Sequence, residues 1–237
     1  MSSDRLAQLR QIKIFSGLSD EHLAGLAERC HWRSYAAGEL IIGHQDRSRD
    51  VLFLISGLAR VNVYALSGKQ VTFRDIRPGE VFGELSAIDE KPRSASVEAL
   101  APSATVIVPQ PVFHDALRSH PPVLLATLTH LTTQIRSLTD RVFEFSTLAV
   151  RSRVQAELVR LARDCRTSDN EALISPAPTH ADIASRISTH REAVTRELNR
   201  LEDLKIIDRE GRALRVLDLR RLTGMIDELT ADWLDPG

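Results

Sequence analysis

The sequence predicts an α+β fold in which a jelly roll is followed by one long helix and a small, mainly helical domain. Two changes in pattern lead to this prediction. From residue 31 to 108, short runs rich in Val, Ile, Leu and Phe are interrupted by glycines, which is typical of short strands and turns. After residue 120, apolar residues recur at helical spacing instead. We therefore divide the chain into residues 1–120, 121–149 and 150–237.

The N-terminal domain begins with a short helix and continues as strands. Ser19 is a plausible N-cap for this helix, and the apolar spacing that follows turns Cys30 toward a core, where free cysteines are most often found. The strands that we expect lie at residues 40–42, 51–55, 59–64, 71–75, 96–100 and 105–108. Turns between strands of this length suit a jelly roll.

The long helix carries an unbroken apolar seam with alternating spacings of three and four residues. A helix of roughly 40 Å is too long for a small core to cover, and a period of 3.5 is typical of coiled coils. The alternative is an amphipathic helix packed wholly on its own domain. We favour a homodimer, with an interface made by Leu124, Leu128, Leu131, Ile135, Leu138, Val142 and Phe145, and with Ala149 as the last seam residue.

Composition limits the classes of function. The chain has 237 residues, of which 43% are hydrophobic, and a formal net charge of −1, so any affinity for nucleic acid must depend on particular arginines. The longest apolar runs are far shorter than the roughly 20 residues of a membrane span, so we expect no membrane partner. Without a signal pattern or a disulfide framework, we expect a cytoplasmic location. The histidines are scattered without metal-ligand spacing, so we expect no metal and no catalytic set.

One motif joins Phe82-Gly83-Glu84-Leu85-Ser86 to Pro92-Arg93-Ser94-Ala95-Ser96 through a short spacer. A cyclic phosphodiester carries one negative charge, so its site requires an arginine fork, a hydroxyl group and a glycine that allows close approach. A carboxylate beside it can accept the ribose 2′-hydroxyl. The alternative is a turn with a surface salt bridge between Glu84 and Arg93.

This motif resembles the phosphate-binding cassette of cyclic-nucleotide-binding domains. The resemblance implies that Gly83 and Glu84 hold the ribose and that Arg93 and Ser94 hold the cyclic phosphate of cAMP or cGMP, within a segment completed by Leu85 and Ser86. It also implies a purine contact from Thr139 on the long helix. Leu138 stands where a second hydroxyl residue would be expected, so the preferred base is left open.

The C-terminal domain contains a second pattern. A helix from 151 to about 165 is followed by two short helices, 181–187 and 192–204, and by a hairpin over 206–216 with its turn near Gly211. Apolar residues of the two short helices face a core, while charged residues share the opposite face. Arginine and glutamate there suit the major-groove edges of guanine and cytosine, although a solvated charged face is the alternative. The DNA contacts that we expect come from Thr179, Arg191, Glu192, Thr195 and Arg196.

The segment from Thr179 to Ile207 resembles the helix-turn-helix of the CRP/FNR family of regulators. The resemblance implies a winged helix-turn-helix on a palindromic, TGTGA-like double-stranded operator, with RNA polymerase as a further partner. Two details qualify it. A Thr189-x-x-Glu192 capping box would compete with base contact by Glu192. Ser188 stands where the family usually has glycine, and a positive φ there costs up to about 1 kcal/mol.

Three other classes of protein fit the sequence less well. Two scattered cysteines provide no ligand set for an iron–sulfur cluster. A haem sensor with Cys30 and His31 as axial ligands would leave the cassette unexplained, and an absorbance spectrum would test it. The regulatory module of an enzyme would need a second domain different from the helix-turn-helix found here. The sequence therefore predicts a transcription regulator that responds to a cyclic nucleotide and is not an enzyme.

Overall fold

The computed structural model describes residues 2–65, 68, 70–163 and 165–226, so residue 1 and residues 227–237 of the predicted domains lie outside the described residues. The chain forms two compact units, Met1–Gln134 and Ile135–Gly237, which divide within helix α5 (Pro121–Thr147). Each unit has its own hydrophobic core. The three-part division made from the sequence stays a prediction.

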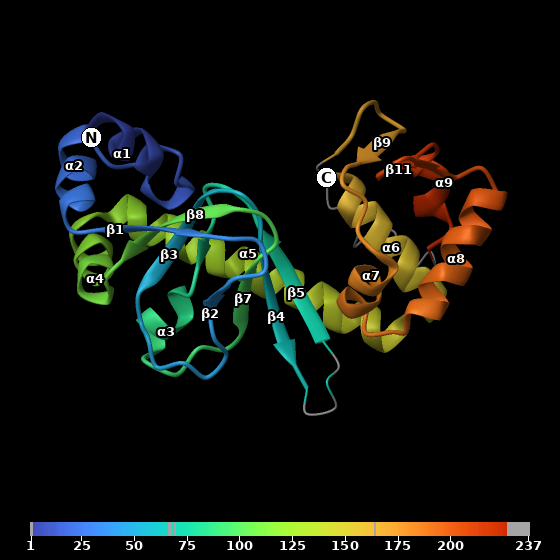
Figure 1. Ribbon diagram of the computed structural model, residues 1–237, viewed down its shortest axis with the longest axis horizontal. Helices are drawn as coiled ribbons and strands as arrows, with labels where there is room; N and C mark the ends of the chain where they lie inside the picture. Colours follow the sequence, from blue (N-terminus) through green and yellow to red (C-terminus); the bar gives the residue numbers. More distant parts are fainter. Residues whose placement is uncertain (1, 66–67, 69, 164, 227–237) are drawn as a thin grey trace. The chain divides into compact units, whose positions relative to one another are not determined.

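Helices precede and follow the strands of the first unit: α1 (Ser2–Arg10), the short 3-10 helix η1 (Lys13–Phe15), α2 (Asp20–Glu28) and α4 (Gln110–Ser119). They lie together at one end of the strands (Figure 1). The predicted cap of α2 is confirmed, because the Ser19 side chain accepts a hydrogen bond from the His22 amide. Cys30 is buried, as expected. Helix α1 was not among the predicted elements.

The strands form the predicted jelly roll, with two four-stranded antiparallel sheets of order β1-β8-β3-β6 and β2-β7-β4-β5. Their bounds are β1 His31–Tyr35, β2 Leu40–Ile42, β3 Val51–Ser56, β4 Ala59–Tyr64, β5 Gln70–Ile76, β6 Val81–Phe82, β7 Ser96–Ala99 and β8 Ser103–Val108. All six predicted strands are present. The sequence missed β1, which is largely exposed and polar, and β6, which has two residues.

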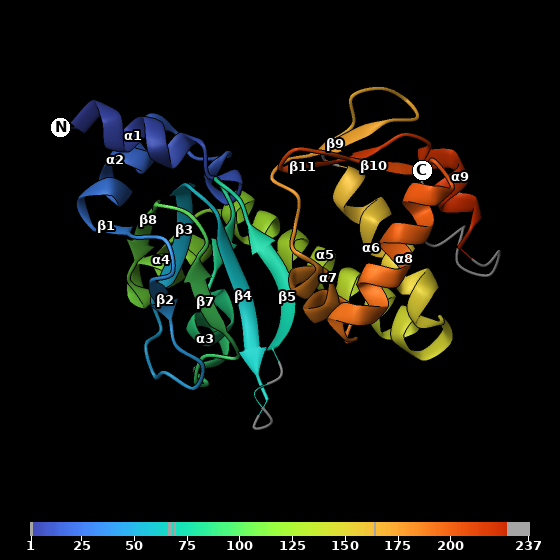
Figure 2. The same cartoon turned by 45° about the vertical axis from the view of Figure 1, so that its right-hand side comes forward.

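The apolar run of β3 is continuous because this strand is buried on both faces. Leu52 and Leu54 belong to the core between the sheets, whereas Val51 and Phe53 belong to the core shared with the helices. Figure 2 shows β3 among the other strands, with the helices beside it. The short helix α3 (Glu84–Asp89) lies between β6 and β7 in the chain.

The second unit combines helices with a small three-stranded sheet. Its elements are α6 Val150–Arg163, β9 Ala172–Ile174, α7 His180–Arg186, α8 Arg191–Asp203, β10 Ile207–Glu210, β11 Ala213–Val216 and α9 Leu219–Gly224. The predicted hairpin is confirmed, with Gly211 at a φ of 60° between its strands. β9 adds an unpredicted third strand to this wing. The helix-turn-helix and the wing are thus both present.

Helix α5 is shorter than the predicted seam. It ends at Thr147 and α6 begins at Val150, so the expectation that Ala149 closes the seam was wrong. Ala149 lies between the two helices and is exposed, whereas its neighbour Leu148 is buried in the core of the second unit. Over the described residues, no helix is long and apolar enough to cross a membrane.

Candidate functional site

Arg93 is the centre of the first site. Only 2% of its surface is exposed. Its guanidinium group donates to three acceptors of the roll: Nη1 to the Gly83 carbonyl at 2.7 Å, Nη2 to the Asp50 carbonyl at 2.8 Å, and Nε to Ser48 Oγ at 3.1 Å. These bonds use three of the five N–H donors of an arginine and hold its plane in one orientation. Two donors remain for another group.

The charge of Arg93 is buried without a direct counter-ion. Among the described residues, no carboxylate lies within ion-pair distance of its guanidinium group, so the surface salt bridge with Glu84 is not formed. Burial lowers the pKa of Arg93, while the more distant carboxylates of Asp50, Asp46 and Glu84 act in the opposite direction. A buried cation of this kind is most stable with an anion beside it.

Both the backbone conformation at position 83 and the small space beside it require glycine. Its φ is 78°, in the left-handed region that favours glycine. A Cβ at this position would lie 2.7 Å from Arg93 Nη1. Gly83 therefore lets the chain approach the guanidinium group closely, as the cassette requires.

The remaining cassette residues differ in exposure. Glu84 and Ser86 are buried, whereas Leu85 and Ser94 are exposed. The Glu84 carboxylate points to α5, where its Oε1 lies 3.6 Å from His130 Nε2. The structure thus brings together Gly83, Glu84 and Arg93, and adds His130, which the sequence reasoning did not include.

Thr139, the predicted purine contact, lies on α5. It belongs to the second unit, is exposed, and donates its hydroxyl proton to the Ile135 carbonyl at 2.9 Å. Nine residues at 100° each place it about half a turn away from His130 around α5. Its face of the helix is the one that carries Ile135, and its purine contact stays a prediction.

The second site is built on α7 and α8. Ile183 and Ile187 are buried, as are Val194, Leu198 and Leu201 from α8. Ser188, in the turn, has a φ of 55°, so the suspected positive φ is confirmed. Serine therefore carries the small conformational penalty that glycine would avoid.

The capping box of this segment is at α7 rather than at α8. Thr179 caps α7: its Oγ1 accepts from the Asp182 amide at 3.1 Å, and the Asp182 carboxylate accepts from the Thr179 amide at 3.0 Å. Helix α8 begins after His190, whose side chain makes no capping bond. The expectation of a Thr189-x-x-Glu192 capping box was therefore wrong, and Glu192 is exposed.

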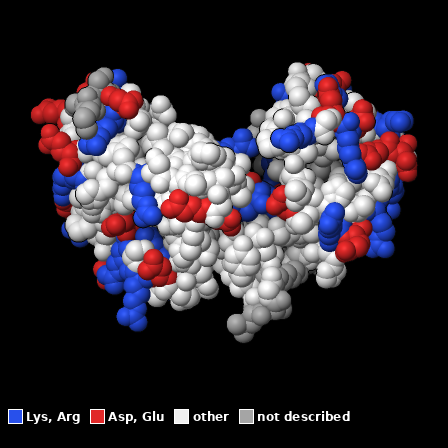
Figure 3. Space-filling view, in the orientation of Figure 1, with Lys and Arg blue, Asp and Glu red and all other residues white. Residues whose placement is uncertain are grey.

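Most of the α8 residues predicted to contact DNA bases are at the surface. Arg191, Glu192 and Arg196 are exposed. Thr195 is half-buried, donates to the Arg191 carbonyl at 3.0 Å and lies 2.7 Å from His180 Nδ1. Burial, followed by the charges of Arg209 and Arg191, lowers the pKa of His180, which favours the neutral ring. Figure 3 shows Arg and Lys interspersed with Asp and Glu on the face in view rather than gathered in one basic patch.

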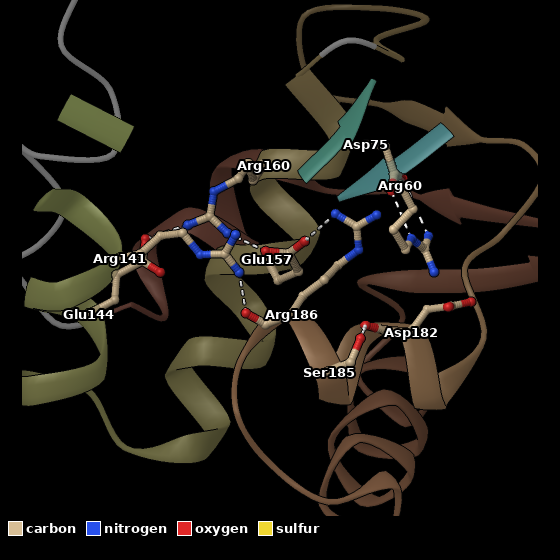
Figure 4. A network of polar contacts seen from close by, with 9 residues as sticks. All are labelled: Arg60, Asp75, Arg141, Glu144, Glu157, Arg160, Asp182, Ser185 and Arg186. Atoms are coloured by element: carbon tan, nitrogen blue, oxygen red, sulfur yellow. Dashed lines mark hydrogen bonds and ion pairs between the residues drawn. The ribbon is translucent and has the colours of Figure 1, made fainter. Parts of the chain in front are cut away.

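A network of buried charged residues contacts α7 (Figure 4). Glu157 of α6, 1% exposed, accepts from Arg160 and lies 3.6 Å from Arg186 of α7. Arg160 also pairs with Glu144 of α5, and Arg141 of α5 donates to the Arg186 carbonyl. Burial lowers the pKa of Arg141, and the charge of Glu157 is the first to oppose it. The network ties the end of α5 to the first helix of the helix-turn-helix.

The seam of α5 is exposed in the single chain. Exposed fractions are 42% for Leu124, 51% for Leu128, 64% for Ile135, 48% for Leu138, 65% for Val142 and 36% for Phe145, while Leu131 is half-buried. An apolar stripe of this length is typical of an interface. It also disfavours the alternative in which the helix packs wholly on its own domain.

The positions of Cys30 and His31 do not support the alternative of a haem sensor. Cys30 is buried, and burial raises the pKa of its thiol to about 12. His31, the next residue, is exposed at the start of β1. The two side chains therefore do not share one site.

Comparisons with known proteins find matches to both domains of the chain. Residues 32–120 match the cyclic nucleotide-binding domain, and residues 152–225 match the Crp-like helix-turn-helix domain. The chain is 24% identical over 202 residues to the cAMP-activated global transcriptional regulator CRP of Pasteurella multocida, covering 85% of this chain and 97% of the relative. It is 23% identical over 215 residues to the CRP-like cAMP-activated global transcriptional regulator of Mycobacterium tuberculosis, covering 90% and 96%.

A solved structure shows the same fold. FixK2 from Bradyrhizobium japonicum superposes with a TM-score of 0.73 at 20% identity, over 84% of this chain and 97% of that one. The two matched domains, joined by α5, define a transcription regulator with a cyclic-nucleotide-binding domain. The chain belongs to the CRP/FNR family, and the two relatives compared above are both named as transcriptional regulators.

Proposed function

We propose that this protein is a homodimeric regulator that binds cAMP or cGMP in its β-roll and a palindromic, TGTGA-like operator through α8. The nucleotide part of the proposal depends on Arg93, a buried cation that has no direct counter-ion among the described residues and lies beside a glycine of positive φ. A cyclic phosphate supplies the missing anion, and Glu84 supplies an acceptor for the ribose. The relatives named for activation by cAMP support the same ligand class.

The exposed seam of α5 supports the homodimer. Pairing two copies removes its apolar side chains from water, at roughly 25 cal/mol for each Å² buried. A twofold dimer presents two recognition helices to successive major grooves, about one DNA turn apart, which explains a palindromic operator. We expect Arg191, Glu192 and Arg196, which are exposed, to contact bases, with further DNA contacts from Thr179 and Thr195. RNA polymerase is the further partner, and a cytoplasmic location is consistent with these roles.

The nucleotide acts by differential affinity. It can favour the DNA-binding arrangement only to the extent that it binds that arrangement more tightly than the alternative. Calorimetric titration with cAMP and with cGMP, followed by operator binding with and without each, tests the proposal. We expect binding of at least one nucleotide and tighter operator binding in its presence. Absence of binding to both nucleotides would contradict the proposed ligand class.

A further inference from the structure

Two polar side chains meet inside the first unit without completing a hydrogen bond. Glu84 Oε1 and His130 Nε2 are 3.6 Å apart, and their side chains are 9% and 18% exposed. This distance is too long for a hydrogen bond between nitrogen and oxygen. His130 Nε2 is buried and has no hydrogen-bond partner within the described part of the chain.

An unpartnered ring nitrogen beside a carboxylate is unfavourable unless a third group joins them. A hydroxyl oxygen can lie about 2.8 Å from each atom, donating its proton to the carboxylate and accepting one from Nε2–H. We propose that His130 is a nucleotide-binding residue that holds the ribose 2′-hydroxyl jointly with Glu84. The inference rests on the proposed function, because Arg93 would hold the phosphate of the same ligand.

The position of His130 gives this contact a second role. His130 lies on α5, near the buried residues Val123 and Thr127, whereas Glu84 lies on α3. A hydroxyl shared by the two side chains would connect the cassette directly to the helix that carries the dimer seam. A nucleotide without this hydroxyl would leave both polar atoms unpaired, and sites of this kind reject such analogues strongly.

The test compares cAMP with 2′-deoxy-cAMP by calorimetry, and repeats the pair with the guanine nucleotides. We expect the wild type to bind the ribonucleotide about 10- to 100-fold more tightly than its deoxy analogue. His130→Leu should reduce this ratio to about one to threefold, and His130→Gln, which keeps an N–H donor, should restore part of it. His114 is the matched control, because its Nε2 donates to the Ala87 carbonyl of α3 at 2.7 Å. His114→Leu should weaken both ligands equally and leave the ratio unchanged.

Nitrogen NMR of the wild-type imidazole provides a readout that does not depend on folding of a variant. The Nε2 signal of His130 should move with the ribonucleotide and stay in place with the deoxy analogue. Equal shifts with both ligands, or an unchanged ratio in His130→Leu, would refute the role of His130 while leaving the proposed function intact. If the wild type binds neither cAMP nor cGMP, the proposed function fails and this inference fails with it.

Discussion

Arg93 shows how one residue type in a buried position narrows the chemistry of a site. Three protein acceptors orient the guanidinium group, yet none of them carries a full negative charge. The three hydrogen bonds fix the orientation of the guanidinium group but do not neutralise its charge. A small anion therefore completes the site better than another protein side chain would.

Arg93→Leu should yield a folded protein that no longer responds to a cyclic nucleotide. The phosphate would lose its buried partner, at a cost of about 2 to 5 kcal/mol in binding free energy. Calorimetry measures the affinity, and circular dichroism checks the fold. Arg29→Leu, which removes an exposed arginine paired with Asp115 at 2.7 Å, is the control and should bind normally. An affinity of Arg93→Leu within twofold of wild type would remove Arg93 from the site.

Arg196→Ala should change the choice of base as well as the affinity for DNA. We expect a loss of roughly 1 to 3 kcal/mol per half-site on the preferred operator and weaker discrimination at one base pair. Binding is measured at fixed salt against operators carrying each base substitution. Arg163→Ala removes the same charge from the exposed end of α6 and should leave the ranking of bases intact. A uniform loss over all operators in Arg196→Ala would make Arg196 a phosphate contact.

At the scale of elements, α5 contributes to two different environments. Its first half is packed in the first unit through Val123 and Thr127, and its last turn joins the ionic network of the second unit through Glu144. The exposed seam runs along both halves. Helix α5 therefore contributes residues to both compact units and carries the exposed apolar seam.

Ile135→Glu should abolish the dimer. Two glutamates would meet across the seam, and desolvating like charges without partners is strongly unfavourable. Sedimentation should show a monomer, and operator binding should be lost with the dimer. Ser137→Glu adds the same charge at an exposed position about 160° from Ile135 around the helix and should leave the dimer intact. A stable dimer of Ile135→Glu would place the interface elsewhere.

Glu157→Gln should destabilise the second unit. The substitution keeps the shape but removes the charge that faces Arg160 and Arg186, so the free energy of unfolding should fall by about 3 kcal/mol. Denaturant unfolding gives the value. Glu202→Gln breaks the partly exposed pair with Arg209, 2.6 Å long, and should cost less than about 1 kcal/mol. Equal effects of both substitutions would show that the network adds nothing to an ordinary surface pair.

For the whole molecule, the two functions should be linked in both directions. If a cyclic nucleotide raises operator affinity by some factor, the operator must raise nucleotide affinity by the same factor. Calorimetric titration of nucleotide into the free protein and into its operator complex measures this factor twice. We expect about 5- to 150-fold, the usual range of allosteric coupling. Nucleotide binding that is identical with and without operator DNA would exclude an allosteric role for the ligand.

Much of the architecture was predictable from the sequence, because local patterns report local structure. Short runs of Val, Ile, Leu and Phe between glycines predicted six strands of the roll, and the apolar spacing in residues 181–187 and 192–204 predicted the two helices of the helix-turn-helix. Two strands that are short or polar were not predicted. β1 is mostly exposed and β6 has two residues, so neither carries enough apolar periodicity to be recognised.

The sequence by itself determined which groups are available: a glycine, a glutamate and an arginine at cassette spacing, and charged residues on one face of α8. Only the tertiary structure decided that Arg93 is buried with no direct counter-ion in the described part of the chain, and that His130 comes within 3.6 Å of Glu84. It also moved the capping box from Thr189 to Thr179. The reason is physical: spacing along the chain constrains neighbours within a turn or strand, whereas burial and contacts between distant segments depend on how the elements pack.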